Sequence, residues 1–237
     1  MRLTYLIAAH NEVHSLDELV NNMLTLLSRI PELQVYVIDN ASDDGTAELL
    51  AKLTRRHHWM HGVSIPDKGL GAAFQYGMRL LRKLDLTKED WIFFNAADLP
   101  FGFTDLESFL KIQPEHPQVS IFIGSKGHAK SVIARSWKRT IASFVFQWAR
   151  RLLLGMKVRD PQGTIFLRGD FLHLVEKIRS DDYFFTTELV YFMQKHSEVI
   201  ELPVILNPDR RSSKVNLLVD GYKVIHQMQA LRRRKNI

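Results

Sequence analysis

Short apolar runs alternate with amphipathic segments through the first half of this chain, and this alternation restricts the fold more than any other feature. The apolar runs have the length of buried strands and cover residues 3–8, 34–39, 62–65, 91–95 and 119–124. The segments between them repeat apolar residues at helical spacing and cover residues 15–30, 44–57 and 71–84. Strands that alternate with helices build a mostly parallel sheet flanked by helices. We therefore expect an α/β fold.

The second half of the chain is basic and has a different pattern. Residues 116–159 contain no acidic residue, and Trp137 and Trp148 belong to an apolar stripe that recurs at helical spacing. This predicts an amphipathic basic helix, which lies either in the headgroup region of a membrane or on the sheet as a core helix. The segments that follow are a strand at 164–167, a helix at 188–195, a strand at 199–203, a polar loop at 208–213 and a last helix ending in a basic cluster at 232–235.

Net charge and composition restrict the classes of molecule that this chain could bind. The 237 residues carry a formal net charge of +6, which favours anionic partners such as phosphates or an anionic membrane surface. We find no reading motif for nucleic acid, and basicity alone does not establish one. Cysteine is absent, which excludes disulfides and thiolate metal sites. The N-terminal apolar run is too short for a signal peptide, and no run approaches the roughly 20 residues of a membrane span, so we expect a soluble or peripheral protein.

Polar residues follow the predicted strands where they end. The stretch 39–46, Asp-Asn-Ala-Ser-Asp-Asp-Gly-Thr, could bind base or ribose hydroxyls, although an ordinary helix cap would look the same. The stretch 68–73, Lys-Gly-Leu-Gly-Ala-Ala, could bring backbone donors to a phosphate, although a plain loop is the alternative. The stretch 68–73 lacks the P-loop sequence, which excludes a P-loop. No GxGxxG follows the first strand, which weakens a dinucleotide-binding interpretation. Ligands of such sheets bind at the carboxyl ends of the strands, so these residues are the candidate site.

Taken together, these segments resemble glycosyltransferase family 2, and specifically its polyprenyl-phosphate branch, which includes dolichol-phosphate mannose and glucose synthases. The resemblance runs from Leu3 to about Asp220 and is carried by residues 8–12 (Ala-Ala-His-Asn-Glu), 37–46, and 68–73 with Gly77. It implies a Rossmann-like GT-A fold in one domain, 1–237, with a nucleotide-sugar-binding half at 1–125 and an acceptor-binding, membrane-facing half at 126–237. It also implies that the donor is bound by Ala8, Asn11, Glu12, Asp39, Asp67, Lys68, Gly71, Ala97, Asp98 and Arg210.

The family's metal motif is incomplete in this chain. Where the family has two acids that hold a divalent cation on the donor diphosphate, residues 95–98 read Asn-Ala-Ala-Asp. The resemblance therefore implies Mg²⁺ or Mn²⁺ with Asp98 as its one clear carboxylate, which can suffice when diphosphate and water fill the other positions. Three alternatives are that Asn95 assists, that cationic side chains neutralise the diphosphate, or that the chain is a degenerate module without activity.

The acceptor follows from charge and from the same resemblance. A phosphate monoester is already a nucleophile at neutral pH and mainly needs cationic side chains to hold it. The resemblance assigns this role to Lys126, in the stretch Gly124-Ser125-Lys126, and to Arg139, which together with Asp98 form the implied catalytic set. Looser matches are residues 160–163 (Asp-Pro-Gln-Gly), Glu188, and residues 213–215 (Ser-Lys-Val), with Arg210 and Arg211 near the diphosphate.

These observations predict an enzyme. The leading hypothesis is inverting transfer of a hexose-type residue from a UDP- or GDP-sugar to a dolichyl- or undecaprenyl-type phosphate, at the cytoplasmic face of a membrane. The alternative within the same class is a soluble or saccharide acceptor, which would require a carboxylate base, with Asp160 and Glu188 as candidates. The sugar, the base, the oligomeric state and the need for a membrane-embedded partner stay open.

Overall fold

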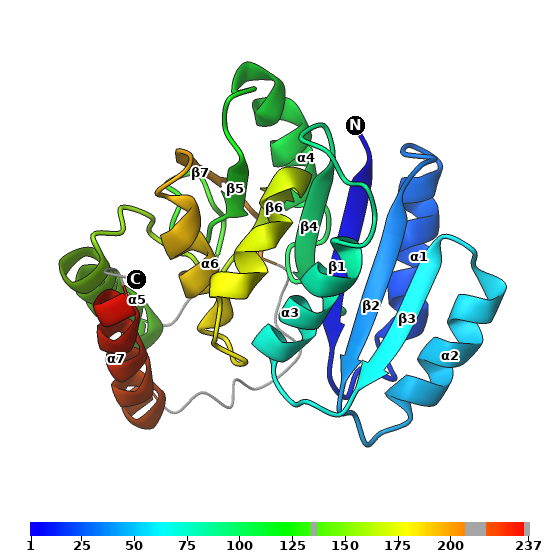
Figure 1. Cartoon of the computed structure of the whole chain (residues 1–237), viewed down its shortest axis with the longest axis horizontal. Coiled ribbons are helices and arrows are strands. Elements are labelled where there is room, and N and C mark those ends of the chain that lie inside the picture. Colours follow the sequence, from blue (N-terminus) through cyan, green and yellow to red (C-terminus); the bar gives the residue numbers. More distant parts are fainter. Residues whose placement is uncertain (134–136, 207–216, 235–237) are drawn as a thin grey trace.

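The computed structural model describes residues 1–133, 137–206 and 217–234 and shows a seven-stranded sheet with the order β3-β2-β1-β4-β6-β5-β7 (Figure 1). The strands are β1 Leu3–Ala9, β2 Gln34–Asn40, β3 Met60–Ile65, β4 Trp91–Ala96, β5 Ile121–Gly124, β6 Thr164–Arg168 and β7 Val199–Leu202. β6 pairs antiparallel with both β4 and β5, and the other pairings are parallel. The expected α/β fold with a mostly parallel sheet is confirmed.

Helices cover both faces of this sheet (Figure 1). They are α1 Leu16–Leu27, α2 Thr46–Arg56, α3 Leu70–Leu81, α4 Thr104–Ile112, α5 Trp137–Leu154, α6 Phe185–Met193 and α7 Leu217–Arg233, with 3-10 helices η1 Gln113–Glu115 and η2 Gly169–Lys177. None of the described helices is long and apolar enough to cross a membrane.

The continuous apolar runs of the strands arise because the sheet has a core on each face. Along β1, Leu6 and Ala8 join the cluster that includes α3 and α6, whereas Tyr5 and Ile7 join the cluster that includes α1 and α4. Successive side chains of a strand point to opposite faces, so a strand buried on both sides carries no polar alternation.

Three elements were not expected from the sequence, and one helix starts earlier than predicted. α4 and η1 follow β4, η2 follows β6, and none of the three was predicted. α6 begins at Phe185 rather than at Glu188, and every one of its residues is buried. A helix that is buried all round lacks the amphipathic stripe from which a boundary is read. The polar loop predicted at 208–213 lies outside the described residues.

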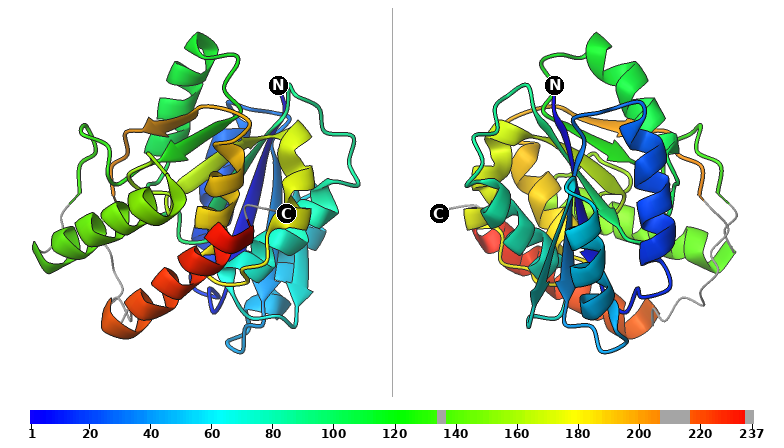
Figure 2. Two further views of the ribbon diagram at one scale, coloured as in Figure 1. Left: turned by 60° about the vertical axis from the view of Figure 1, so that its left-hand side comes forward. Right: turned by 90° about the vertical axis from the view of Figure 1, so that its right-hand side faces the viewer.

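The helices α5 and α7 pack against each other and project from the sheet as a pair (Figure 2). Phe146 and Leu153 of α5 and Val224 of α7 pack on the same core cluster, while Trp148 of α5 is 60 % exposed. Of the two alternatives left open by the sequence, α5 does pack on the core, but Trp148 does not take part in that packing. The side chain of Trp137 lies outside the described residues.

Candidate active site

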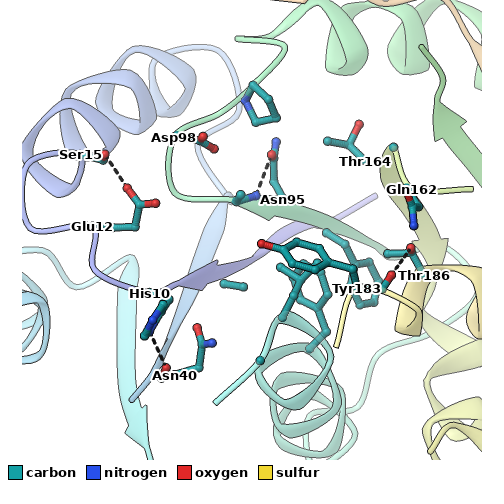
Figure 3. A pocket seen from close by; sticks show the side chains of 18 of the residues that line it. His10, Glu12, Ser15, Asn40, Asn95, Asp98, Gln162, Thr164, Tyr183 and Thr186 are labelled. Carbon is teal, nitrogen blue, oxygen red and sulfur yellow. Dashed lines mark hydrogen bonds between the residues drawn. The ribbon is translucent and has the colours of Figure 1, made fainter. Parts of the chain in front are cut away.

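A cavity of about 1130 Å³ lies where the carboxyl ends of β1, β2, β4 and β5 meet the start of β6 (Figure 3). Six predicted site residues line it, namely Ala8, Asn11, Glu12, Lys68, Asp98 and Lys126. The carboxyl ends of parallel strands meet at one edge of a sheet, which is why residues so far apart in sequence come together.

The turns after β1 and β2 are joined by side-chain hydrogen bonds. Asn11 Nδ2 donates to Asp43 Oδ1 at 2.8 Å, and the Asp43 amide donates to Asn11 Oδ1 at 2.9 Å. Asn11 has a φ of 57°, a left-handed conformation that asparagine tolerates better than most residues. This pairing fixes one wall of the cavity.

Asp39 belongs to the same network but does not reach the cavity. Its carboxylate accepts a short hydrogen bond from Ser42 Oγ, and its side chain is 2 % exposed. The predicted donor residues Asp67, Gly71 and Ala97 also lie outside the lining. Ala97 is buried in the core, and Asp67 is exposed just before α3.

Glu12 and Asp98 are the carboxylates among the lining residues, and Figure 3 shows both on the same side of the cavity. Ser15 Oγ donates to Glu12 Oε2 at 2.7 Å. Asp98 lies in a turn that places it at the cavity, and in this turn the Leu99 amide donates to the Ala96 carbonyl at 3.1 Å. Leu99 has a φ of 42°.

Asn95 lies on the cavity floor beside this turn. Its Oδ1 accepts a hydrogen bond from the Ala96 amide at 2.9 Å, and this bond fixes the orientation of the amide group. Its buried Nδ2 has no hydrogen-bond partner among the described residues. Asn95 thus has its oxygen engaged in one hydrogen bond to the backbone, and its buried nitrogen is a donor without a partner among the described residues.

The part of the chain that the structure describes contains no group of three or more histidine, aspartate or glutamate side chains suited to hold a metal ion. Asp98 alone fits the weaker arrangement, in which one carboxylate and the phosphate oxygens of a substrate share a Mg²⁺ or Mn²⁺ ion.

The glycine turn before α3 is packed too tightly for side chains. A Cβ on Gly71 would lie 2.4 Å from the Ser180 carbonyl oxygen, and one on Gly69 would lie 2.2 Å from that of Asp181. Gly71 therefore serves packing, while the neighbouring Lys68 lines the cavity. The amino end of α3 also faces this region, and helix amino ends favour anions.

Lys126 lines the cavity from the turn after β5. Its backbone amide donates to Asp160 Oδ2 at 3.2 Å, and its Nζ lies 3.9 Å from the same oxygen. Beneath this turn Arg150 is 7 % exposed, and burial lowers its pKa while the charges of Asp160 and Glu201 raise it. Burial outweighs these charges, so the pKa of Arg150 is lowered on balance, and Asp160 lies beside this buried cation, outside the cavity lining.

Glu188, the second candidate base, is fully buried on α6. Its Oε2 accepts from the amides of Arg179 and Ser180 at 3.1 and 2.7 Å, and its Oε1 accepts from the Arg234 guanidinium. It does not line the cavity, so neither proposed base is placed where a substrate would be.

Comparison with known protein families identifies the family of this chain. The family model described as "Glycosyl transferase family 2" matches residues 4–183. The chain belongs to glycosyl transferase family 2. It is a nucleotide-sugar-dependent glycosyltransferase with the GT-A fold.

Solved glycosyltransferases share this fold at low sequence identity. Glucosyl-3-phosphoglycerate synthase from Mycobacterium tuberculosis, in complex with Mn²⁺, UDP and phosphoglyceric acid, is 15 % identical with a TM-score of 0.65, covering 97 % of this chain and 76 % of that one. Mannosyl-3-phosphoglycerate synthase from Rubrobacter xylanophilus is 16 % identical with a TM-score of 0.66, covering 99 % and 74 %. A mannosyltransferase from Pyrobaculum calidifontis, in complex with GDP-Man and Mn²⁺, is 16 % identical with a TM-score of 0.54, covering 97 % and 69 %.

Several lining residues of this glycosyltransferase were not among the predicted site residues. His10 and Asn40 lie at the ends of β1 and β2, where the His10 Nδ1 is 2.9 Å from the Asn40 carbonyl oxygen. Their position beside predicted residues was an available signal. Tyr183, just before α6, and Thr186, in its first turn, also reach the cavity. Thr186 belongs to the looser match around Glu188, which was an available signal, whereas no sequence signal marks Tyr183. Arg210 and the side chain of Arg139 lie outside the described residues.

Proposed function

We propose that this glycosyltransferase transfers a sugar from a UDP- or GDP-sugar, with inversion, to a polyprenyl phosphate. In this reaction an oxygen of the acceptor phosphate attacks the anomeric carbon, the bond from that carbon to the diphosphate breaks, and nucleoside diphosphate leaves. Residues 1–125 supply the donor site and residues 126–237 the acceptor site of one domain. The donor contacts proposed here are the predicted residues that line the cavity, namely Ala8, Asn11, Glu12, Lys68 and Asp98. Asp39, Asp67, Gly71 and Ala97 lie outside the lining, and a donor contact by Arg210 stays a prediction.

The charges of the side chains at the cavity support the roles that we propose for individual residues. Asp98 would hold Mg²⁺ or Mn²⁺, which stabilises the charge that develops on the departing diphosphate. Lys68 contributes a cation near the amino end of α3, where a phosphate is favoured. Lys126, with Arg139 as its proposed partner, binds the acceptor phosphate through charge-assisted hydrogen bonds.

The observation that carries the proposal is that, among the described residues, neither carboxylate predicted as the base lines the cavity, whereas the cation Lys126 does. Asp160 and Glu188 are both engaged in ion pairs and both lie outside the cavity lining, whereas Lys126 lies in it. A saccharide hydroxyl needs a base to remove its proton, and a phosphate does not. A saccharide acceptor would leave Glu12 as the remaining carboxylate for that task.

The exposed face of α5 supports a lipid acceptor. Phe144, Val145, Trp148 and Leu152 are all exposed and fall on one side of the helix, with the exposed Arg151 at its edge. Large exposed apolar side chains beside a cation suit the headgroup region of an anionic membrane. Figure 2 shows that α5, together with α7, projects from the sheet. We propose peripheral binding at the cytoplasmic face of a membrane.

The test is a transfer assay with the purified chain, radiolabelled UDP- and GDP-sugars, Mg²⁺ or Mn²⁺, and polyprenyl phosphate, followed by organic extraction. Parallel reactions contain phosphoglyceric acid or a saccharide in place of the lipid. Label in the organic phase is the expected result.

Transfer to phosphoglyceric acid alone would show a soluble phosphorylated acceptor held by the same cation. Transfer to the saccharide alone, lost in Glu12→Gln, would overturn the phosphate-acceptor proposal. No transfer and no nucleotide-sugar binding would make the chain a degenerate module.

A further inference from the structure

Residues 179–186, which lead into the first turn of α6, form one wall of the cavity and pack on the glycine turn. Tyr183 and Thr186 line the cavity. The Ala72 amide donates to the Asp181 carbonyl at 2.9 Å, and Gln75 Nε2 donates to the Ser180 carbonyl at 2.9 Å. The close approach at Gly69 and Gly71 described above means that this wall and the turn bearing Lys68 cannot shift independently.

The opposite side of the same segment is held by α7, which arrives from the far end of the chain. Lys223 Nζ lies 2.6 Å from Asp182 Oδ2, and Gln227 Nε2 donates to the same oxygen at 3.0 Å. Arg234, just past the end of α7, pairs with the buried Glu188, whose other oxygen binds the amides of Arg179 and Ser180. Each ion pair therefore fixes the backbone of the wall.

Asp182 has a local role at the start of α6 as well as its contact with α7. Asp182 Oδ1 also accepts from the Phe184 amide at 2.9 Å, so the carboxylate is already used at the start of α6 without α7. Burial raises the pKa of Asp182, and the hydrogen bonds from Lys223, Phe184 and Gln227 outweigh this and hold it below its usual range. Loss of Lys223 leaves the Phe184 hydrogen bond at the start of α6 and the contacts made by Gln227 and Arg234, but it removes the ion pair between the wall and α7.

We infer that α7 is a positioning element for the nucleotide site: Lys223 and Arg234 hold residues 179–186 against the turn that bears Lys68. The inference rests on the proposed donor site in this cavity. A wall that is held in place keeps the binding-competent conformation populated, and the apparent affinity for a ligand falls in proportion to that population. Weakening α7 should thus weaken nucleotide binding, although none of the α7 side chains that the structure describes, at residues 221–233, lines the cavity.

The experiment uses the full chain and calorimetric titration with UDP and with GDP, each with Mg²⁺. The variants are Lys223→Met, Asp182→Asn and the double variant. Asn at position 182 keeps an oxygen for the Phe184 amide and removes the charge. Arg233→Gln, an exposed cation on the same helix, is the matched control. We expect each single variant to raise the Kd of the nucleotide about three- to tenfold, the size usual for coupling between sites.

The double variant separates positioning from general destabilisation. If the two groups act as one pair, the double variant should bind about as weakly as either single variant rather than showing the product of the two losses. Coupling is reciprocal, so nucleotide should also slow amide hydrogen exchange in residues 221–234 of the wild type, and less so in Lys223→Met.

Each outcome bears on a different claim. Unchanged nucleotide affinity in Lys223→Met and Asp182→Asn, with wild-type binding intact, would overturn the role of α7. An equal loss in Arg233→Gln would overturn it too, because the effect would then be one of net charge. Failure of the wild type to bind UDP, GDP and their sugars would instead reject the donor site, and with it the basis of the inference.

Discussion

At the scale of single residues, Asp98 depends on an unusual backbone conformation. Leu99 is 4 % exposed and has a φ of 42°, a region that a branched residue such as leucine rarely occupies. Burial of the leucine in the core offsets this strain, and the turn holds Asp98 at the cavity. The proposed metal contact thus depends on Asp98, which is held by a strained turn.

Asp98→Asn keeps the shape of this side chain and removes its charge. If the carboxylate holds the metal, turnover should fall at least about a hundredfold, because such charge stabilisation is worth several kcal/mol. Steady-state transfer assays would measure this, with Mg²⁺-dependent nucleotide binding lost as well. Lys126→Met is the comparison, for which we expect a higher acceptor KM and nearly unchanged nucleotide binding. Full turnover in Asp98→Asn would reject the metal assignment.

Asp105 provides a second test at this scale, through pH. Burial raises the pKa of this carboxyl to about 7, against the hydrogen bonds from Thr164 Oγ1 at 2.8 Å and from the Leu106 amide. The folded protein therefore binds a proton that the unfolded chain has released between about pH 4 and 7. Its contribution to the free energy of unfolding is greatest below pH 4, falls by at most about 1.4 kcal/mol per pH unit across that window, and is constant above it.

Other groups titrate in the same pH range, so the test compares the free energy of unfolding of the wild type with that of Asp105→Asn. Denaturant unfolding of wild type and Asp105→Asn across pH 4–8 should show a gap between them that changes with pH and becomes constant above pH 7. The exposed Glu107→Gln, also on α4, should give no such change. A gap that does not vary between pH 4 and 7 would contradict the raised pKa.

At the scale of secondary structure, the two faces of α5 have different tasks. One face packs on the core and on α7, and the other presents Trp148 and Leu152 to solvent. Trp148→Ser with Leu152→Ser should reduce binding to vesicles containing anionic lipid about tenfold or more, since each large apolar side chain contributes about 1.5–3 kcal/mol when fully buried. Vesicle sedimentation measures this binding.

The control for this double variant is Leu24→Ser, which replaces an exposed leucine on α1. It should leave vesicle binding unchanged. Equal binding of the α5 variant and the wild type would remove the support that α5 gives to a lipid acceptor.

At the scale of the whole molecule, a ligand of the cavity should stabilise the fold. The site draws on β1, β4, β5 and the start of α6, so unfolding destroys it. UDP or GDP with Mg²⁺ at about one hundred times its Kd should add about 2.7 kcal/mol, which corresponds to a rise in Tm of roughly 5–10 °C. Differential scanning calorimetry would record it. EDTA should remove most of the rise, and Asp98→Asn should show little of it in either condition.

Sequence alone determined the order of strands and helices in the first half and the place of the site. The apolar runs at β1, β2 and β4 are strands because both faces of the sheet are buried, and this leaves an unmistakable pattern. The polar residues after them had to meet, since parallel strands end at the same edge. Asn11, Glu12, Lys68 and Asp98 were found in this way, and they line the cavity.

Tertiary structure alone decided the roles of the second half. β6 enters antiparallel between β4 and β5, and this insertion brings Lys126 to the cavity that holds Asp98. Glu188 looked like a possible base, yet it is buried by Arg234 from 46 positions further along the chain. A carboxylate's environment depends on partners brought by packing, and such long-range pairing leaves no periodic signal in the sequence.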